Sequence, residues 1–218
     1  MRRAIPIAAF SLTLFIHQAA GQPQAPPAPP LTMAQVWTLD AVYADPQHGV
    51  TFRHPSTWAA TTQFAYLPPA LTQSADAKPI AGFGYSEGGF PRKRIVGPYS
   101  ATNLEGFGIV YAAVAAASTA ECNAKAASLS DQSQNSRIVF AGRGFQTYAT
   151  GSAGMSQSIA GSLYATYSAH ICYLFETDVA VASPGALDNI QPLTPAQSRD
   201  IQARLLNIMR SVRIAPKE

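Results

Sequence analysis

Two uninterrupted apolar runs constrain the fold of this chain more than any other feature. Residues 109–115 and residues 171–175, which read Ile-Cys-Tyr-Leu-Phe, contain no charged side chain. Because successive side chains of a strand point to opposite faces, a strand that is apolar at every position is covered on both faces. We therefore expect two central strands, with further layers packed on each side of their sheet.

Two helices are expected to contribute to these layers. The clearer one follows Thr194, Pro195 and Gln197, which match the N-cap, the N1 proline and the N3 partner of a capping box. Its apolar side chains recur at helical spacing, at Ile201, Leu205, Ile208 and Val212. A short final strand is expected over residues 212–214.

The other helix is expected from Ser118 to about Ser130. Ser118 and Glu121 have the spacing of a capping box. The apolar side chains that share one face of this helix are Cys122, Ala126 and Leu129. We therefore expect Cys122 to point into the core.

Shorter segments with alternating or apolar patterns predict the remaining strands. They cover residues 50–54, 80–85, 137–140, 145–150 and 163–167. The predicted order along the chain is strands, a helix, further strands and a final helix. This order indicates an α+β fold. We expect a mainly antiparallel β-sheet with packed helices, of the α/β/α sandwich type, that ends in an amphipathic helix.

Glycine-rich segments are expected to interrupt these strands. Residues 86–106 predict an exposed loop or hairpin arm, and Gly142 and Gly144 predict a β-bulge. Residues 151–162, which are rich in Gly and Ser, predict a flexible connector or the rim of a binding site.

The amino-terminal residues have the pattern of a secretory signal peptide. Two arginines precede an apolar stretch over residues 4–16. Small residues at Ala19 and Gly21 favour cleavage before Gln22, and cleavage after Ala20 is the alternative. The apolar stretch is shorter than the roughly 20 residues that a membrane-spanning helix needs.

These patterns divide the chain into three parts. We expect a signal peptide over residues 1–21, a Pro-rich linker over residues 22–35 and a single α+β domain over residues 36–218. No cysteine lies near the cleavage site, and no later segment is long and apolar enough to span a bilayer. We therefore expect a soluble protein, either periplasmic or secreted from the cell.

The charge balance argues against a nucleic-acid-binding protein. The chain has 15 Lys and Arg against 12 Asp and Glu, and loss of the two signal-peptide arginines leaves a net charge of +1. The one basic cluster, Arg92, Lys93 and Arg94, is typical of a solvated loop. With 47% apolar and 12% charged residues, the main body is expected to fold.

Cys122 and Cys172 are the only cysteines, and export would place them in an oxidising compartment. An even number with no other partner predicts a disulfide between them, and the alternative is two buried thiols that never meet. Two cysteines this far apart in the chain, with no CxxC spacing, do not form a zinc ligand set.

Residues near each end of the expected domain resemble a known family. The first set is Tyr43, Asp45, Gly49, Val50, Phe52, Pro55 and Trp58. The second set, at the end of the last helix, is Ile208, Ser211, Val212 and Ile214. This order is similar to that of the PsbP and DcrB-like group of small exported α/β/α sandwich proteins, over most of residues 40–214. The resemblance implies a binding or accessory role without catalysis and assigns no functional residue.

Residues 84–88 match GxSxG, the nucleophile elbow of the α/β-hydrolases, around Ser86. An elbow needs a helix after the serine, and the glycines and proline that follow cannot start one. A triad also needs an acid and a histidine later in the chain. The only histidine downstream is His170, inside an apolar strand, and the acid would be the distant Asp131. A serine hydrolase that uses Ser86 is therefore the alternative to a binding role.

The other candidate residues do not form a convincing site. His48 and His54 flank a turn with Asp45, but strand geometry places His54 inward and His48 in the turn. Glu176 and Asp178 share a strand face and are expected to solubilise the strand end rather than act as acid and base. We expect no catalytic residue, no metal and no cofactor.

Taken together, these patterns favour a non-enzymatic binding or accessory module of the cell envelope. Its partner would be an envelope protein or a small ligand, and no nucleic acid or membrane span is expected. The sequence assigns no residue to that binding.

Overall fold

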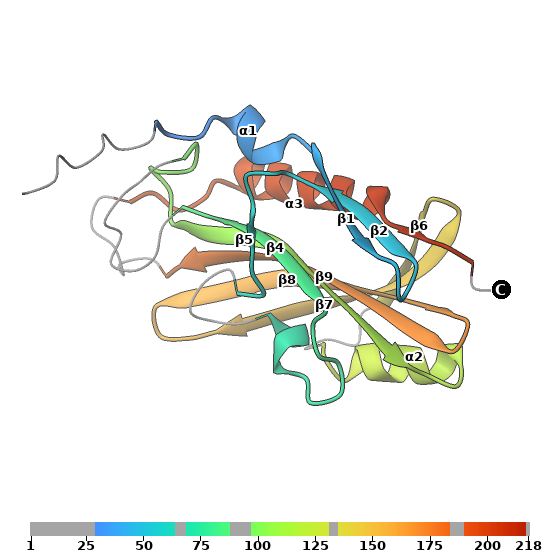
Figure 1. The fold of residues 1–218 in the computed structure, drawn as a ribbon. Coiled ribbons are helices and arrows are strands. Elements are labelled where there is room, and N and C mark those ends of the chain that lie inside the picture. Colours follow the sequence, from blue (N-terminus) through green and yellow to red (C-terminus); the bar gives the residue numbers. More distant parts are fainter. Residues whose placement is uncertain (1–28, 64–68, 88–96, 131–134, 184–189, 217–218) are drawn as a thin grey trace, which may run out of the picture.

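The structure is a computed structural model that describes residues 29–63, 69–87, 97–130, 135–183 and 190–216. These residues form three layers (Figure 1): a seven-stranded sheet in the middle, a small sheet with α1 and α3 on one face, and α2 with the short helix η1 on the other. The expected α+β class, a mainly antiparallel sheet with packed helices and a terminal helix, is confirmed.

The large sheet is antiparallel throughout, with the strand order β3-β4-β5-β9-β8-β7-β6. Its strands are β3 (Ala59–Ala60), β4 (Ala81–Ser86), β5 (Leu104–Ala115), β6 (Asn135–Phe140), β7 (Arg143–Ala153), β8 (Gln157–Ser168) and β9 (Ile171–Ala182). Both predicted central strands lie inside the sheet, because β9 pairs with β5 on one side and with β8 on the other.

β9 has one face toward each outer layer. Tyr173 and Phe175 pack with the core residues of α3, and Cys172 and Leu174 pack with those of α2. We call these two sides of the large sheet the α3 face and the α2 face. All four side chains are at most 1% exposed, so the prediction of a strand buried on both faces is confirmed.

α3 (Pro195–Ser211) begins with the predicted capping box. Thr194 Oγ1 accepts a hydrogen bond from Gln197 N, and Gln197 Oε1 accepts one from Thr194 N. The predicted apolar stripe is buried, each side chain being at most 2% exposed: Ile201, Leu205, Ile208 and Val212. The predicted final strand is also present, as β10 (Arg213–Ile214).

α2 (Thr119–Ala127) ends three residues before the predicted end. Ser118 Oγ accepts a hydrogen bond from Glu121 N, as predicted. The Glu121 carboxylate instead accepts from Ala117 N at 2.6 Å, so the capping box is only half formed. Leu129 lies beyond the helix and is partly buried. The buried side chains of α2 are Cys122 and Ala126.

The small sheet has the order β1-β2-β10. β1 (Ala41–Asp45) and β2 (Val50–His54) form a hairpin, which confirms the predicted strand and the turn before it. Gly49 has φ 67°, a left-handed conformation that glycine adopts without a steric penalty. The Asp45 carboxylate accepts from two backbone N–H groups of the turn, so the turn is closed by its first residue.

α1 (Met33–Trp37) begins within the predicted linker. The Thr32 side chain caps the helix, and Trp37 stacks on Phe107 of β5 with ring centroids 4.3 Å apart. The predicted signal peptide, residues 1–21, and most of the predicted linker lie outside the described residues. No helix within the described ranges is long and apolar enough to cross a membrane.

Two predictions for glycine-rich segments were wrong. Ala141 and Gly142 form the tight turn that joins β6 to β7 rather than a bulge, with the positive φ values of 51° and 78° that such a hairpin turn requires. Residues 151–162, which we expected to form a loop, belong to β7 and β8 apart from residues 154–156. Glycine and serine have low strand propensity, so pairing with neighbouring strands determines these elements.

The segment 86–106 also differs from its predicted exposed loop. Among its described residues, Glu87, Tyr99 and Leu104 are at most 2% exposed. Glu87 Oε1 accepts hydrogen bonds from the Tyr85 hydroxyl at 3.0 Å and from Tyr99 N at 2.8 Å. This buried carboxylate fixes the segment onto the end of the sheet.

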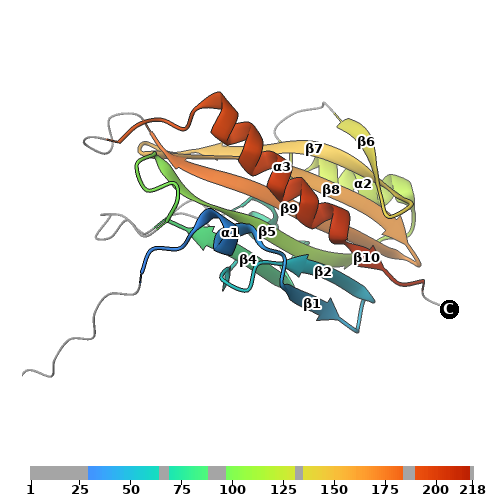
Figure 2. The same cartoon turned by 90° about the horizontal axis from the view of Figure 1, so that it is seen from above.

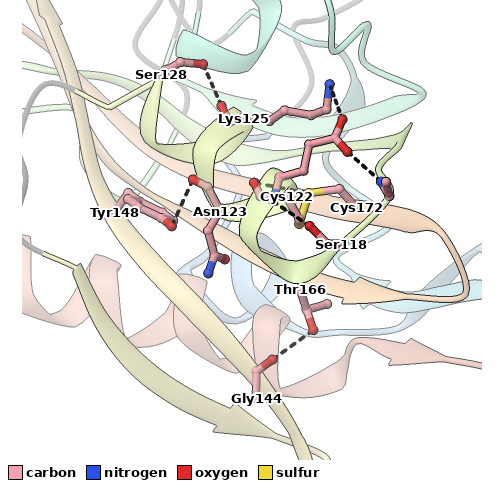
Figure 3. Close-up of a disulfide and its surroundings, with 11 residues drawn as sticks. Ser118, Cys122, Asn123, Lys125, Ser128, Gly144, Tyr148, Thr166 and Cys172 are labelled. Carbon is pink, nitrogen blue, oxygen red and sulfur yellow. Dashed lines mark hydrogen bonds and ion pairs between the residues drawn. A yellow bond between two sulfur atoms is a disulfide. The ribbon is translucent and has the colours of Figure 1, made fainter.

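A disulfide joins Cys122 of α2 to Cys172 of β9, which confirms the predicted pairing (Figure 3). Their Cα atoms are 5.1 Å apart, and both residues are fully buried in the core of the α2 face. Next to the bond, the Tyr148 hydroxyl of β7 donates to the Asn123 carbonyl at 3.2 Å. The bond therefore ties α2 to the central strand β9.

Replacing both cysteines by alanine should lower the melting temperature while the far-ultraviolet circular dichroism spectrum stays native. The bond closes a loop with a sequence separation of 50, for which chain entropy gives a stabilisation of up to about 4 kcal/mol. In a domain of this size we expect Tm to fall by roughly 5–15 °C. An unchanged Tm relative to the oxidised wild type would contradict a stabilising role.

Candidate functional site

A groove on the α3 face is the candidate functional site. A helix is about 10 Å wide and strands are spaced by about 4.8 Å, so one helix covers about two strands. The small sheet covers another part of this face, where Tyr43 and Phe52 pack on Phe83 of β4. Seen from above, α3 runs diagonally between the small sheet and the outer strands (Figure 2). Beside α3, parts of β7 and β8 remain uncovered.

The large sheet supplies the floor of the groove. The cavity volume is about 620 Å³, within the range of small-molecule sites. Ala149 of β7 and Ala160 of β8 lie in the floor, and their short side chains keep it deep. Val179 of β9 adds an apolar side chain. The floor can therefore accept a ligand with an apolar part.

Four residues that line the groove carry hydroxyl groups: Thr150, whose hydroxyl lies near Asp178 Oδ1, and Ser162, Tyr164 and Thr177. Burial raises the pKa of the Tyr164 hydroxyl, and hydrogen bonding with the Thr177 and Ser162 side chains acts in the opposite direction. The Tyr164 hydroxyl is therefore neutral near pH 7. Each neutral hydroxyl can both donate and accept a hydrogen bond, so the floor can also hold a polar group.

The wall of the groove is one stripe of α3. Arg199, Gln202, Ala203 and Leu206 are spaced by three and four residues, so they share a face of the helix. The stripe recurs at helical spacing in the sequence, and its residues are not among the predicted site residues. What the sequence does not show is which part of the sheet lies opposite.

Arg199 is the one charged side chain among the described residues that line the groove. It is exposed, and within the described part of the chain it makes no hydrogen bond or ion pair. Arg204 is engaged instead, because its Nε lies 2.8 Å from Asp200 Oδ2 and its guanidinium lies over the ring of Trp37. Within the described residues, no acid neutralises the positive charge that Arg199 brings to the groove.

A second hollow, of about 560 Å³, lies between β10 and the turn from β6 to β7. Arg143 and Arg213 line it. Arg213 Nη1 donates to the carbonyls of Arg210 and Val212, so this guanidinium closes the end of α3. Of the described lining residues only Thr51 carries a hydroxyl, so the α3 groove is the better candidate.

Glu176 and Asp178 are not at an exposed strand end as we expected, because both are fully buried on the α2 face. The Glu176 carboxylate accepts hydrogen bonds from Ala70 N at 3.0 Å and Leu71 N at 2.6 Å. These two groups start η1 (Ala70–Gln73). Glu176 therefore fixes η1 to the sheet, a contact across more than 100 residues of chain that local patterns do not reveal.

Asp178 has fewer partners. Asp178 Oδ1 lies 3.5 Å from the Thr150 hydroxyl, and Oδ2 has no partner within the described residues. Gly161 on the neighbouring strand makes room for this carboxyl, since an added Cβ would overlap Oδ1. Burial raises the pKa of Asp178 well above its usual value, and the adjacent Glu176 raises it further. With no exposed surface, the pair cannot reach a substrate.

The residues around Ser86 do not assemble a catalytic triad. Ser86 ends β4, and its hydroxyl donates to the Glu105 carbonyl at 3.1 Å. His170, which we expected inside a strand, lies in the turn between β8 and β9 with φ 61°. Across the sheet Ser86 is level with Ala180, ten residues from His170, which is about 30 Å along a strand. Asp131 lies outside the described residues.

The histidines near Asp45 do not converge either. His48 Nδ1 lies 2.6 Å from Asp45 Oδ2, whereas His54 lies at the other end of the hairpin and stacks on Phe83. The described residues contain no group of three or more potential metal ligands. The basic cluster at residues 92–94 lies outside them.

Comparisons with known proteins show only distant likeness. No protein-family model matches the chain, and no curated protein matches it. A solved structure from Bacteroides thetaiotaomicron matches 83% of this chain, with 9% sequence identity and a TM-score of 0.42. The match covers 50% of the Bacteroides chain, so this chain spans half the length of that protein. LpqN of Mycobacterium tuberculosis, described as involved in cell envelope biogenesis, has 11% identity and a TM-score of 0.40, over 87% of this chain and 100% of LpqN. These likenesses do not confirm a PsbP-like fold and carry no argument about function.

Asp178→Asn should make stability less dependent on pH. Because the pKa of Asp178 is raised in the folded state, its contribution to stability is fully present below the unfolded pKa of about 4 and is lost as pH rises through the folded pKa. Asparagine keeps the acceptor for Thr150 and cannot ionise. We expect urea midpoints near those of the wild type at pH 4 and higher than those of the wild type at pH 8.

Asp76→Asn is the matched control, since Asp76 is exposed. It should leave the pH dependence of the urea midpoint unchanged. If Asp178→Asn shows the same pH dependence as the wild type, Asp178 does not hold a proton in the folded protein.

Proposed function

We propose that this protein is an exported, non-enzymatic binding or accessory module of the cell envelope, and that it holds a small ligand in the α3 groove. The groove itself carries the proposal, with its volume of about 620 Å³. Its mixture of apolar side chains and a few polar groups is the usual composition of ligand sites.

Export is part of the proposal. The proposed organisation is a signal peptide over residues 1–21, a linker over residues 22–35 and a single domain over residues 36–218, in the periplasm or outside the cell. The buried disulfide supports it, because such bonds form and persist in oxidising compartments. The resemblance to the PsbP and DcrB-like group, retained here as a proposal, also favours a binding role.

The described residues favour binding over catalysis. His170 lies about 30 Å along the strand from the level of Ser86, and the paired carboxylates Glu176 and Asp178 have no exposed surface. No observation on the described residues favours the serine hydrolase alternative, because His170 lies far along the strand from Ser86 and Asp131 lies outside the described residues.

Filling the groove should abolish ligand uptake. The neutral fluorophore N-phenyl-1-naphthylamine serves as a general reporter of an apolar site. Ala203 faces the groove from α3, so Ala203→Trp would place an indole in the cavity. We expect its affinity for the fluorophore, measured by fluorescence titration, to fall at least about fivefold.

Ala124→Trp is the control, because Ala124 is an exposed alanine of α2, on the other face of the sheet, and does not line the groove. It should bind the fluorophore as the wild type does. Equal affinity in all three proteins would rule out the α3 groove as the ligand site.

A further inference from the structure

We infer that the ligand of the α3 groove is an organic anion, a molecule with an apolar body and one carboxylate or similarly charged group, and that Arg199 binds the charged group. This inference rests on the proposed function and specifies the chemistry of the ligand. It depends on the position of Arg199, on the absence of a neutralising acid among the described residues, and on the arrangement of polar and apolar side chains around it.

The helix directs Arg199 into the groove. Gln202 and Ala203, three and four residues later, line the same cavity, so the three side chains share one face of α3. Asp200 is the next residue in the chain, but adjacent residues of a helix do not face each other. Asp200 pairs with Arg204 instead, at 2.8 Å. The acid nearest in sequence to Arg199 is therefore already engaged.

No described lining residue of the groove is acidic. An anion that enters would therefore meet one uncompensated positive charge and no like charge. A guanidinium also matches a carboxylate geometrically, because two of its N–H groups can donate to the two oxygens in parallel. Next to apolar walls, such a contact is stronger than in open water.

The other lining residues suit the body of such a ligand. Leu206 lies two turns along α3 from Arg199, so the wall changes from charged to apolar along the groove. Opposite, Val179 and Ala160 offer apolar contact, and the Ser162 and Thr177 hydroxyls offer hydrogen bonds. An apolar body with one anionic end fits this arrangement better than a cation or a fully polar molecule.

Two matched fluorophores test the inference. 8-Anilinonaphthalene-1-sulfonate has the same aromatic body as N-phenyl-1-naphthylamine and adds one negative charge. We expect the wild type to bind the anionic probe more tightly than the neutral one. Arg199→Gln should weaken binding of the anionic probe roughly five- to tenfold and leave the neutral probe unchanged.

Two further variants separate charge from structure. Arg199→Lys keeps the positive charge and should retain most of the affinity for the anionic probe. Arg53→Gln removes an exposed arginine of β2 that does not line the groove, and it should change neither affinity.

The outcomes separate this inference from the proposed function. If both probes bind the wild type and Arg199→Gln weakens neither, or weakens both equally, the anion inference is overturned, and the Ala203→Trp result alone decides whether the groove is a binding site. If the anionic probe loses affinity equally in Arg53→Gln, its binding reports surface charge and the inference is also overturned. If neither probe binds the wild type, the proposed function itself fails.

Discussion

The burial of β9 on both faces is the constraint on which the rest of the structure depends. Its residues from Cys172 to Ala180 are at most 9% exposed, so each face of the strand needs a layer that removes it from water. On the α2 face that layer is a short helix held by the buried disulfide, together with η1, which the Glu176 carboxylate fixes to the strand. On the α3 face it is a long amphipathic helix and a small sheet.

The two layers differ in how completely they cover the sheet, and this difference creates the groove. The α3 face is covered by separate elements that meet over β5 and β9 and leave part of β7 and β8 open. The residues beneath the opening are small or carry hydroxyls, such as Ala160 and Ser162, so water and small molecules can reach the floor. The buried carboxylates lie on the opposite face, where they stabilise packing and are separated from the groove by the sheet itself.

Elements whose stability is local could be predicted from the sequence. The capping box of α3 needs only Thr194 and Gln197, and the buried runs of β5 and β9 are apolar in themselves. The disulfide could be predicted because the sequence contains only two cysteines.

The strand character of residues 151–162 could not be predicted, because glycine and serine form strands only when neighbouring strands pair with them. The burial of Asp178 depends on the missing side chain of Gly161, on another strand. The groove likewise requires the register of β8 against β9, which brings Ser162 beside Thr177.

The most direct test of the groove as the binding site is a ¹H–¹⁵N nuclear magnetic resonance titration of the purified protein with 8-anilinonaphthalene-1-sulfonate. Binding in the α3 groove predicts that the amides that shift belong to β7, β8, the part of β9 around Val179 and the stretch of α3 from Arg199 to Leu206. Amides of the second hollow, around β10 and the turn from β6 to β7, should stay in place. Shifts confined to that second hollow, or no shifts at all, would contradict the assignment of the ligand site to the α3 groove.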